Sequence, residues 1–190
     1  MVPGVAQLRP WFIGIAVAFA ACTASPPAAQ QEQQTATNTE KACELLTKVD
    51  AEAALGSPIE DESDESSLTP LGDKALLGRC YYEGDGGSVS LSVQKHVDAV
   101  YAGERFARYR NRSDKDPSFR SLSGLGDDAF AEYERLHVKR GDLILIVELR
   151  YKGERKLKHY GDKPGLDALA ADERKIAEQA LRRLPPVAKS

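Results

Sequence analysis

Strict alternation of apolar and polar residues from Ser88 to Gln94 constrains the fold more than any other feature of this chain. Successive side chains of an extended chain point to opposite sides, so this period of two predicts a strand with one buried face and one solvated serine face. The buried positions are Val89, Leu91 and Val93. Glycines surround Asp85 just before this strand, and the aromatic segment 80–83 precedes them, so we expect a hairpin.

A similar order of segments occurs in the second half of the chain. Residues 130–138 and 143–151 are predicted strands, and Arg140-Gly141-Asp142 is a predicted turn between them. A helix is predicted after each hairpin, over residues 97–110 and 166–184. We therefore expect an α+β fold in which an antiparallel sheet of four to five strands has helices packed on one face, with a hairpin-helix pseudo-repeat.

The folded domain is expected to begin with a helix near Ala42. Its apolar residues at helical spacing are Cys43, Leu46, Val49 and Ala53. Thr47 and Asp50 form a capping-box signature, and Gly56 should end the helix. Five acids follow within residues 60–65 without regular apolar spacing. This segment lacks the glycine and the ligand spacing of an EF-hand calcium loop, so we predict a solvated loop.

The first 21 residues have the layout of a secretory signal peptide, in which Arg9 precedes the apolar run from Trp11 to Ala21. This run is shorter than the roughly 20 residues that a membrane-spanning helix requires. The residues Phe19-Ala20-Ala21-Cys22 resemble the lipobox of bacterial lipoproteins, although Phe19 replaces the usual aliphatic residue. The resemblance implies that the Cys22 sulfur receives a diacylglycerol and that the preceding peptide is removed. The alternative is ordinary cleavage after Ala20, which would release a soluble secreted protein.

The three cysteines favour lipid attachment over this alternative. Lipidation uses Cys22 and leaves Cys43 and Cys80 as an even pair in an oxidising compartment, where disulfides form and persist. Ordinary cleavage would leave an odd thiol. We therefore predict lipid attachment at Cys22 and a disulfide between Cys43 and Cys80.

Three regions follow from these patterns: a signal peptide over residues 1–21, a lipidated N-terminus with a flexible tether over residues 22–41, and a single α+β domain over residues 42–190. The tether is rich in Pro, Ala, Gln and Thr and has few large apolar residues. Thr23, rather than Asp, follows the lipidated cysteine. The resemblance to lipoproteins then implies the periplasmic side of the outer membrane in a Gram-negative cell, or the outer face of the plasma membrane in a Gram-positive one.

Several short motifs occur together in the predicted domain. They are Cys43-Glu44-Leu45-Leu46-Thr47, Leu55-Gly56, Cys80-Tyr81-Tyr82 and the segment GLGDDAF at residues 124–130. Together they resemble a family of secreted lipoprotein domains of unknown function that is best represented in actinobacteria. The resemblance covers roughly residues 42–184. It implies a disulfide-linked α+β domain and supplies no catalytic residues.

Composition and motifs argue against several classes of function. A net charge of −3 lacks the basic excess of a nucleic-acid-binding protein. The GxGxxA match over residues 124–129 precedes a predicted strand rather than a helix, so a tight turn is expected instead of a dinucleotide site. His96, His137 and His159 are scattered without a zinc-binding pattern, and no nucleophile-elbow motif is present. We therefore predict no metal site, no cofactor and no nucleic-acid partner.

These observations predict a membrane-tethered envelope lipoprotein that acts as a non-enzymatic ligand-binding or protein-interaction module. Its partners are expected to be the membrane, through the N-terminal lipid, and an envelope protein, an anionic lipid or a cell-wall polymer. The basic stretches 105–120 and 152–159 either contact such anionic partners or are simply solvated surface. The alternative function is a cell-wall or lipid hydrolase whose site is built from dispersed acidic residues.

Overall fold

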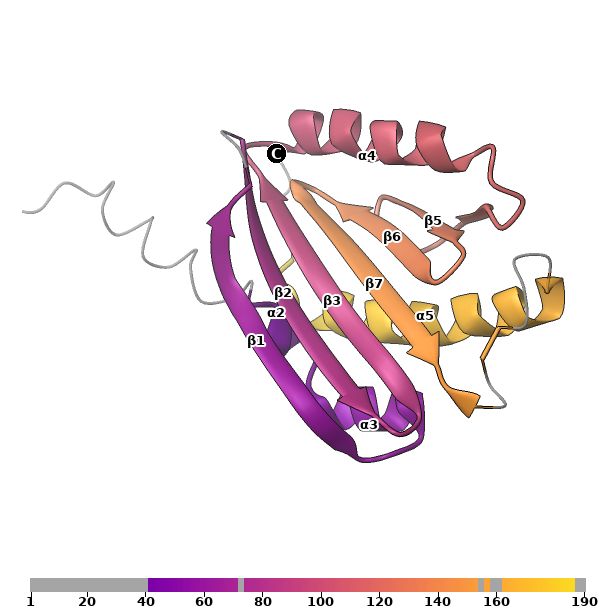
Figure 1. Cartoon of the computed structure of the whole chain (residues 1–190). Coiled ribbons are helices and arrows are strands. Elements are labelled where there is room, and N and C mark those ends of the chain that lie inside the picture. Colours follow the sequence, from indigo (N-terminus) through magenta and orange to yellow (C-terminus); the bar gives the residue numbers. More distant parts are fainter. Residues whose placement is uncertain (1–40, 72–73, 154–155, 158–161, 187–190) are drawn as a thin grey trace, which may run out of the picture.

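The computed structural model describes residues 41–71, 74–153, 156–157 and 162–186. Within them, seven strands form one antiparallel sheet in the order β1-β2-β3-β7-β6-β5-β4 (Figure 1). The strands are β1 (Ile59–Pro70), β2 (Ala75–Gly84), β3 (Gly87–His96), β4 (Arg120–Leu122), β5 (Asp128–Glu132), β6 (Arg135–Arg140) and β7 (Leu143–Tyr151). The helices are α2 (Ala42–Leu45), α3 (Lys48–Leu55), α4 (Ala99–Ser113) and α5 (Lys163–Arg183). The fold is α+β with an antiparallel sheet, as predicted, but the sheet is larger than the expected four to five strands.

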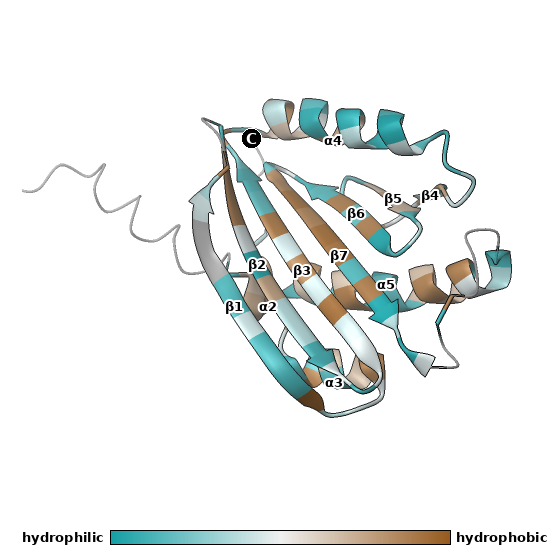
Figure 2. Cartoon of the chain, in the orientation of Figure 1, coloured by the Kyte–Doolittle hydropathy of each residue, from teal (hydrophilic) through white to brown (hydrophobic). Residues whose placement is uncertain are grey.

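The first additional strand is β1, which replaces the solvated loop predicted over residues 60–65. It pairs with β2 along the outer edge of the sheet, with Asp61 opposite Glu83 and Asp64 opposite Cys80. Its coloured residues are mostly hydrophilic (Figure 2). An edge strand needs little apolar surface when its backbone hydrogen bonds are made, and its charges discourage pairing with another chain. The prediction of a loop was wrong because it took an apolar pattern to be necessary for a strand.

A second difference lies in the segment 130–138, which was predicted as one strand. It forms parts of β5 and β6, joined by a turn at Tyr133 and Glu134. Tyr133 has a φ of 48°, a left-handed conformation that is uncommon for a bulky residue. Hairpin turns of this length usually contain Gly, Asn or Asp, and none of these occurs here.

The helices cover both faces of the sheet, not one face as predicted. Helices α2, α3 and α5 pack on one side, which we call the α5 face, and α4 packs on the other side, which we call the α4 face (Figure 1). On the α4 face, Phe106 meets Phe130 edge-on at 5.3 Å between ring centroids and packs with Ile144. The hairpin-helix order therefore occurs twice, but the two helices lie on opposite sides.

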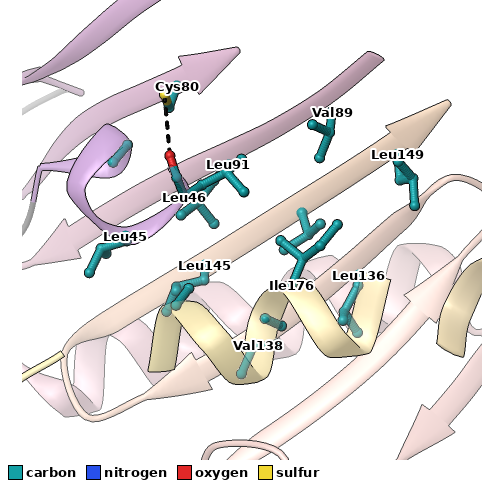
Figure 3. Packing of buried hydrophobic residues seen from close by; sticks show 14 of the residues in the cluster. Leu45, Leu46, Cys80, Val89, Leu91, Leu136, Val138, Leu145, Leu149 and Ile176 are labelled. Carbon is teal, nitrogen blue, oxygen red and sulfur yellow. Dashed lines mark hydrogen bonds between the residues drawn. The ribbon is translucent and has the colours of Figure 1, made fainter. Parts of the chain in front are cut away.

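The main core lies on the α5 face. Figure 3 shows side chains from α2, β2, β3, β6, β7 and α5 converging there, among them Leu46, Leu91, Leu145 and Ile176. Cys43 and Cys80 form the predicted disulfide, with an S–S distance of 2.03 Å and a Cα–Cα distance of 5.0 Å. The bond joins α2 to β2 at the edge of this core.

The predicted first helix is two helices. The capping box begins the second one, because Thr47 accepts a hydrogen bond from the Asp50 amide and the Asp50 carboxylate accepts one from the Thr47 amide. Gly56 ends it in a left-handed conformation, as expected. Val49 was expected on the apolar face but is 72% exposed, since the break before α3 rotates it away from the core.

The β2–β3 hairpin is confirmed, with Gly84 opposite Gly87. Val89, Leu91 and Val93 are fully buried on the α5 face. The serine face of β3 was predicted to be solvated, but Ser90 and Gln94 on it are buried. Helix α4 covers part of this face, and its Tyr109 hydroxyl donates to the Gln94 side-chain oxygen at 3.1 Å.

The predicted signal peptide and most of the predicted tether, including Cys22, lie outside the described residues. Among the residues that the structure describes, no helix is both long enough and apolar enough to cross a membrane.

Candidate functional site

A hollow of about 460 Å³ lies at one end of the central strands, on the rim of the sheet. It is lined where β1 ends, β2 begins and β3 passes into α4, with the β6–β7 turn beside it. The lining residues are Pro70, Lys74, Ala75, Leu76, Lys95, His96, Val97 and Asp142. Antiparallel pairing brings them together, since Leu76 is opposite Lys95 and the His96 amide donates to the Asp142 carbonyl at 2.9 Å. We call this site the rim hollow.

Exposed aliphatic side chains gather around the rim hollow. Among the described residues, five large hydrophobic side chains are exposed, and four of them are in this region: Leu71, Leu76, Val97 and Val100. Val97 and Val100 are 62% and 73% exposed. Single exposed aliphatic residues are ordinary, but a group beside an apolar hollow is typical of a binding surface.

The charged groups of the rim hollow are two lysines and one acid. Lys74 is exposed, and its ammonium lies 5.1 Å from the centroid of the Tyr101 ring in α4. Lys95 and Asp142 are partly buried. The rim hollow therefore combines an apolar floor with a small excess of positive charge, a combination suited to an amphiphilic ligand.

The His96 side chain points to the α4 face, because it is one residue beyond Lys95, which shares the side of β3 that carries Val93. Its ring packs beside Tyr101 of α4, with 5.6 Å between the centroids. Among the described residues neither ring nitrogen has a hydrogen-bond partner. Burial and the nearby Arg105 lower the pKa of His96, while Asp142 and the Lys74 backbone oppose this shift. The neutral ring is a packing element beneath the start of α4.

A second hollow, of about 300 Å³, lies at the β5–β6 turn and is lined mainly by charged residues. They are Asp116, Glu132, Tyr133, Glu134, Arg135, Glu148 and Arg150. Burial raises the pKa of Glu134, and Glu148 adds to this effect, while Arg150 opposes it. We call this site the charged hollow, because it is where dispersed acids converge.

Each acid of the charged hollow has a partner. Asp116 accepts hydrogen bonds from the Ser118 amide and hydroxyl. Glu132 binds the His137 ring at 3.0 Å, and this bond is the main cause of its lowered pKa. Glu134 pairs with Arg150 at 3.1 Å, and Glu148 pairs with Arg135 and Arg150. The Tyr133 amide is held by the Ser118 hydroxyl at 2.8 Å, which helps to fix the strained turn.

The residues singled out in the sequence do not form one site. Cys43 and Cys80 are joined, whereas Cys22 and His159 lie outside the described residues. His96 and His137 are both buried on the α4 face, and the described part of the chain contains no group of three residues that could hold a metal ion. Much of the basic stretch 152–159 is likewise not described, and Lys152 binds Glu83 at 2.8 Å.

The glycine segment at residues 124–129 is a turn that leads into β5, as predicted. Gly124 and Gly126 have positive φ angles. The Asp127 carboxylate accepts hydrogen bonds from the Gly141 amide at 2.7 Å and from the Lys139 ammonium at 3.0 Å. The Asp127 carboxylate therefore ties this turn to the β6–β7 turn.

A comparison of the chain with protein-family models, with curated proteins and with solved structures finds no match in any of the three. The site must therefore be interpreted from its own geometry.

Sequence reasoning missed the rim hollow. Leu76 and Val97 are of residue types that are usually buried, and their sequence neighbours give no sign that they are exposed. The useful signal would have been the hairpin register, which places the first residues of one predicted strand beside the last residues of the next.

Proposed function

We propose that the chain is an envelope lipoprotein, acylated at Cys22, whose folded domain is a non-enzymatic module that binds an amphiphilic ligand in the rim hollow. The observation that carries this proposal is the grouping of four exposed aliphatic side chains around an apolar hollow edged by two lysines. Its volume lies within the usual range for small-ligand pockets, about 300–1,000 Å³. The lipobox resemblance and the tether supply the membrane attachment.

The charged hollow is the observation that favours the alternative, a cell-wall or lipid hydrolase. A general acid or base needs a carboxyl group that is free to exchange a proton with the substrate. Glu132, Glu134 and Glu148 are instead engaged by His137, Arg135 and Arg150. The ion pairs explain this cluster as a support for the β5–β6 turn, which is why we propose a binding module.

Binding is tested with a fluorescent single-chain amphiphile below its micelle-forming concentration. The mature protein should bind it saturably, and Val97→Asp should weaken binding about tenfold or more, because a charge replaces a valine contact. Val49→Asp is the matched control, since Val49 is 72% exposed on α3 and lies away from the rim hollow. Absence of saturable binding, or equal losses in the two variants, would contradict the proposed function.

Attachment is tested separately by metabolic labelling with a fatty acid. The wild-type chain should incorporate the label and fractionate with membranes, and Cys22→Ser should do neither. Labelled Cys22→Ser protein would show that the acylation site is wrong.

A further inference from the structure

The rim hollow continues onto the outer side of α4. Val97 lines the hollow, and Val100 follows in the first turn of the helix. Residues four apart share one side of a helix, so Val100 is aligned with Glu104 and Arg108, all exposed. The hydropathy colouring shows α4 as a mainly hydrophilic helix (Figure 2). Exposed aliphatic groups at one end therefore adjoin a charged helical surface.

Positive charge exceeds negative charge around these aliphatic groups. The cations are Lys74, Lys95, Arg108 and Arg112, and the acids are Asp98, Glu104 and Asp142. Arg110 lies on the inner side of α4, where it pairs with Asp128 at 2.8 Å. Aliphatic side chains surrounded by cations are the composition of surfaces that dock on anionic bilayers, where apolar groups enter the interface and cations contact headgroups.

We propose that the rim hollow and the adjoining side of α4 dock the domain on an anionic phospholipid bilayer. This inference rests on the proposed function and names its ligand, the acyl and headgroup region of membrane lipids. Val97 and Val100 enter the interface, while Lys74 contacts phosphate groups. A tether raises the local concentration of the domain at the membrane, so a weak docking surface suffices.

The chain offers a matched pair of reporter positions for a direct test. Val100 and Val49 are 73% and 72% exposed, but Val49 lies on α3, away from the proposed docking surface (Figure 1). The chain contains one tryptophan, Trp11. Trp11 lies in the predicted signal peptide, which the mature protein lacks, so Val100→Trp and Val49→Trp in the mature protein each report on one position.

Each mature variant is mixed with phosphatidylcholine vesicles whose acyl chains are brominated, with or without phosphatidylglycerol. Bromine quenches a tryptophan that enters the acyl region. We expect the Val100→Trp fluorescence to be quenched and blue-shifted in the anionic vesicles, and to recover at high salt. Val49→Trp should change in neither vesicle. Adding Lys74→Gln to the Val100→Trp variant should reduce the ratio of docked to undocked protein about fivefold, and Lys48→Gln should not.

The outcomes separate this inference from the proposed function. Equal quenching of Val100→Trp and Val49→Trp, or no quenching in anionic vesicles, would overturn bilayer docking. Equal quenching of Val100→Trp in neutral and anionic vesicles would overturn the role of charge. In either case, saturable binding of the single-chain amphiphile would still support the proposed function. Absence of that binding would contradict both the proposed function and bilayer docking.

Discussion

The two faces of the sheet are stabilised in different ways. On the α5 face three helices enclose one extended aliphatic core, and the Cys43–Cys80 disulfide closes its edge. On the α4 face a single helix covers a small aromatic cluster around Phe130, and ion pairs and polar groups surround that cluster. The first face therefore supplies most of the apolar burial, which dominates folding.

This difference bears on where binding can occur. A surface that must meet a ligand or a membrane keeps exposed apolar groups at some loss of stability, and the large core of the α5 face allows it. The rim hollow lies where that core ends and α4 begins. Three sets of substitutions probe the two faces, two of them on the α5 face and one on the α4 face.

The largest effect is expected from the disulfide. Replacing Cys43 and Cys80 by serine should lower the free energy of unfolding by about 4 kcal/mol, because the bond closes a loop of 37 residues in the unfolded chain. Chemical denaturation measures the loss. The alanine pair is the control that separates the crosslink from the polarity of serine. A loss below about 1 kcal/mol would show that the core holds without the crosslink.

Phe106→Ala should remove about 3 kcal/mol, at the lower end of the usual range for buried phenylalanine, because the cluster is small. We expect faster amide hydrogen exchange in α4, with α5 remaining protected. Ile176→Ala is the control, since Ile176 lies in the main core and its loss should affect α5. Equal loss of protection in both helices after Phe106→Ala would show that the faces unfold together.

The smallest of the three effects concerns Glu173, a fully buried carboxyl group on α5. Neither of its oxygens has a hydrogen-bond partner among the described residues. Burial raises the pKa of Glu173 well above the ordinary 4.5; Glu134 and Glu148 add to this, while the Leu149 backbone and Arg120 oppose it. Glu173→Leu should therefore stabilise the protein by about 2 kcal/mol at neutral pH.

The pH dependence gives this prediction its sign. Below pH 4.5 the Glu173 carboxyl is protonated in both the folded and the unfolded chain. As the pH rises above that value, it ionises in the unfolded chain but stays protonated in the folded one, so the free energy of unfolding falls. The gain in free energy of unfolding that Glu173→Leu gives over the wild-type protein should therefore grow with pH. The corresponding difference for Glu173→Gln should change with pH in the same way. If the difference in free energy of unfolding between Glu173→Leu and the wild-type protein stayed constant above pH 4.5, Glu173 would have to ionise in the folded protein.

The sequence by itself determined the elements whose pattern is local. The alternation in β3, the apolar β7, the capping box at Thr47 and the pairing of Cys43 with Cys80 were all predictable, because each depends on periodicity, on neighbouring residues or on a count of cysteines. The α+β class followed from the order of these elements. The β2–β3 hairpin followed from its glycine turn.

Only the tertiary structure decided the rest. The acids of β1 became a strand because β2 offered a free edge, and Tyr133 adopted a left-handed conformation because Ser118 and the flanking pairs hold the turn. Helix α4 took the opposite face because Phe130 and Ile144 project there from strands that also serve the main core. The rim hollow brings together Pro70, Leu76, Val97 and Asp142 from separate segments, and its shape and exposure depend on long-range packing that local patterns do not encode.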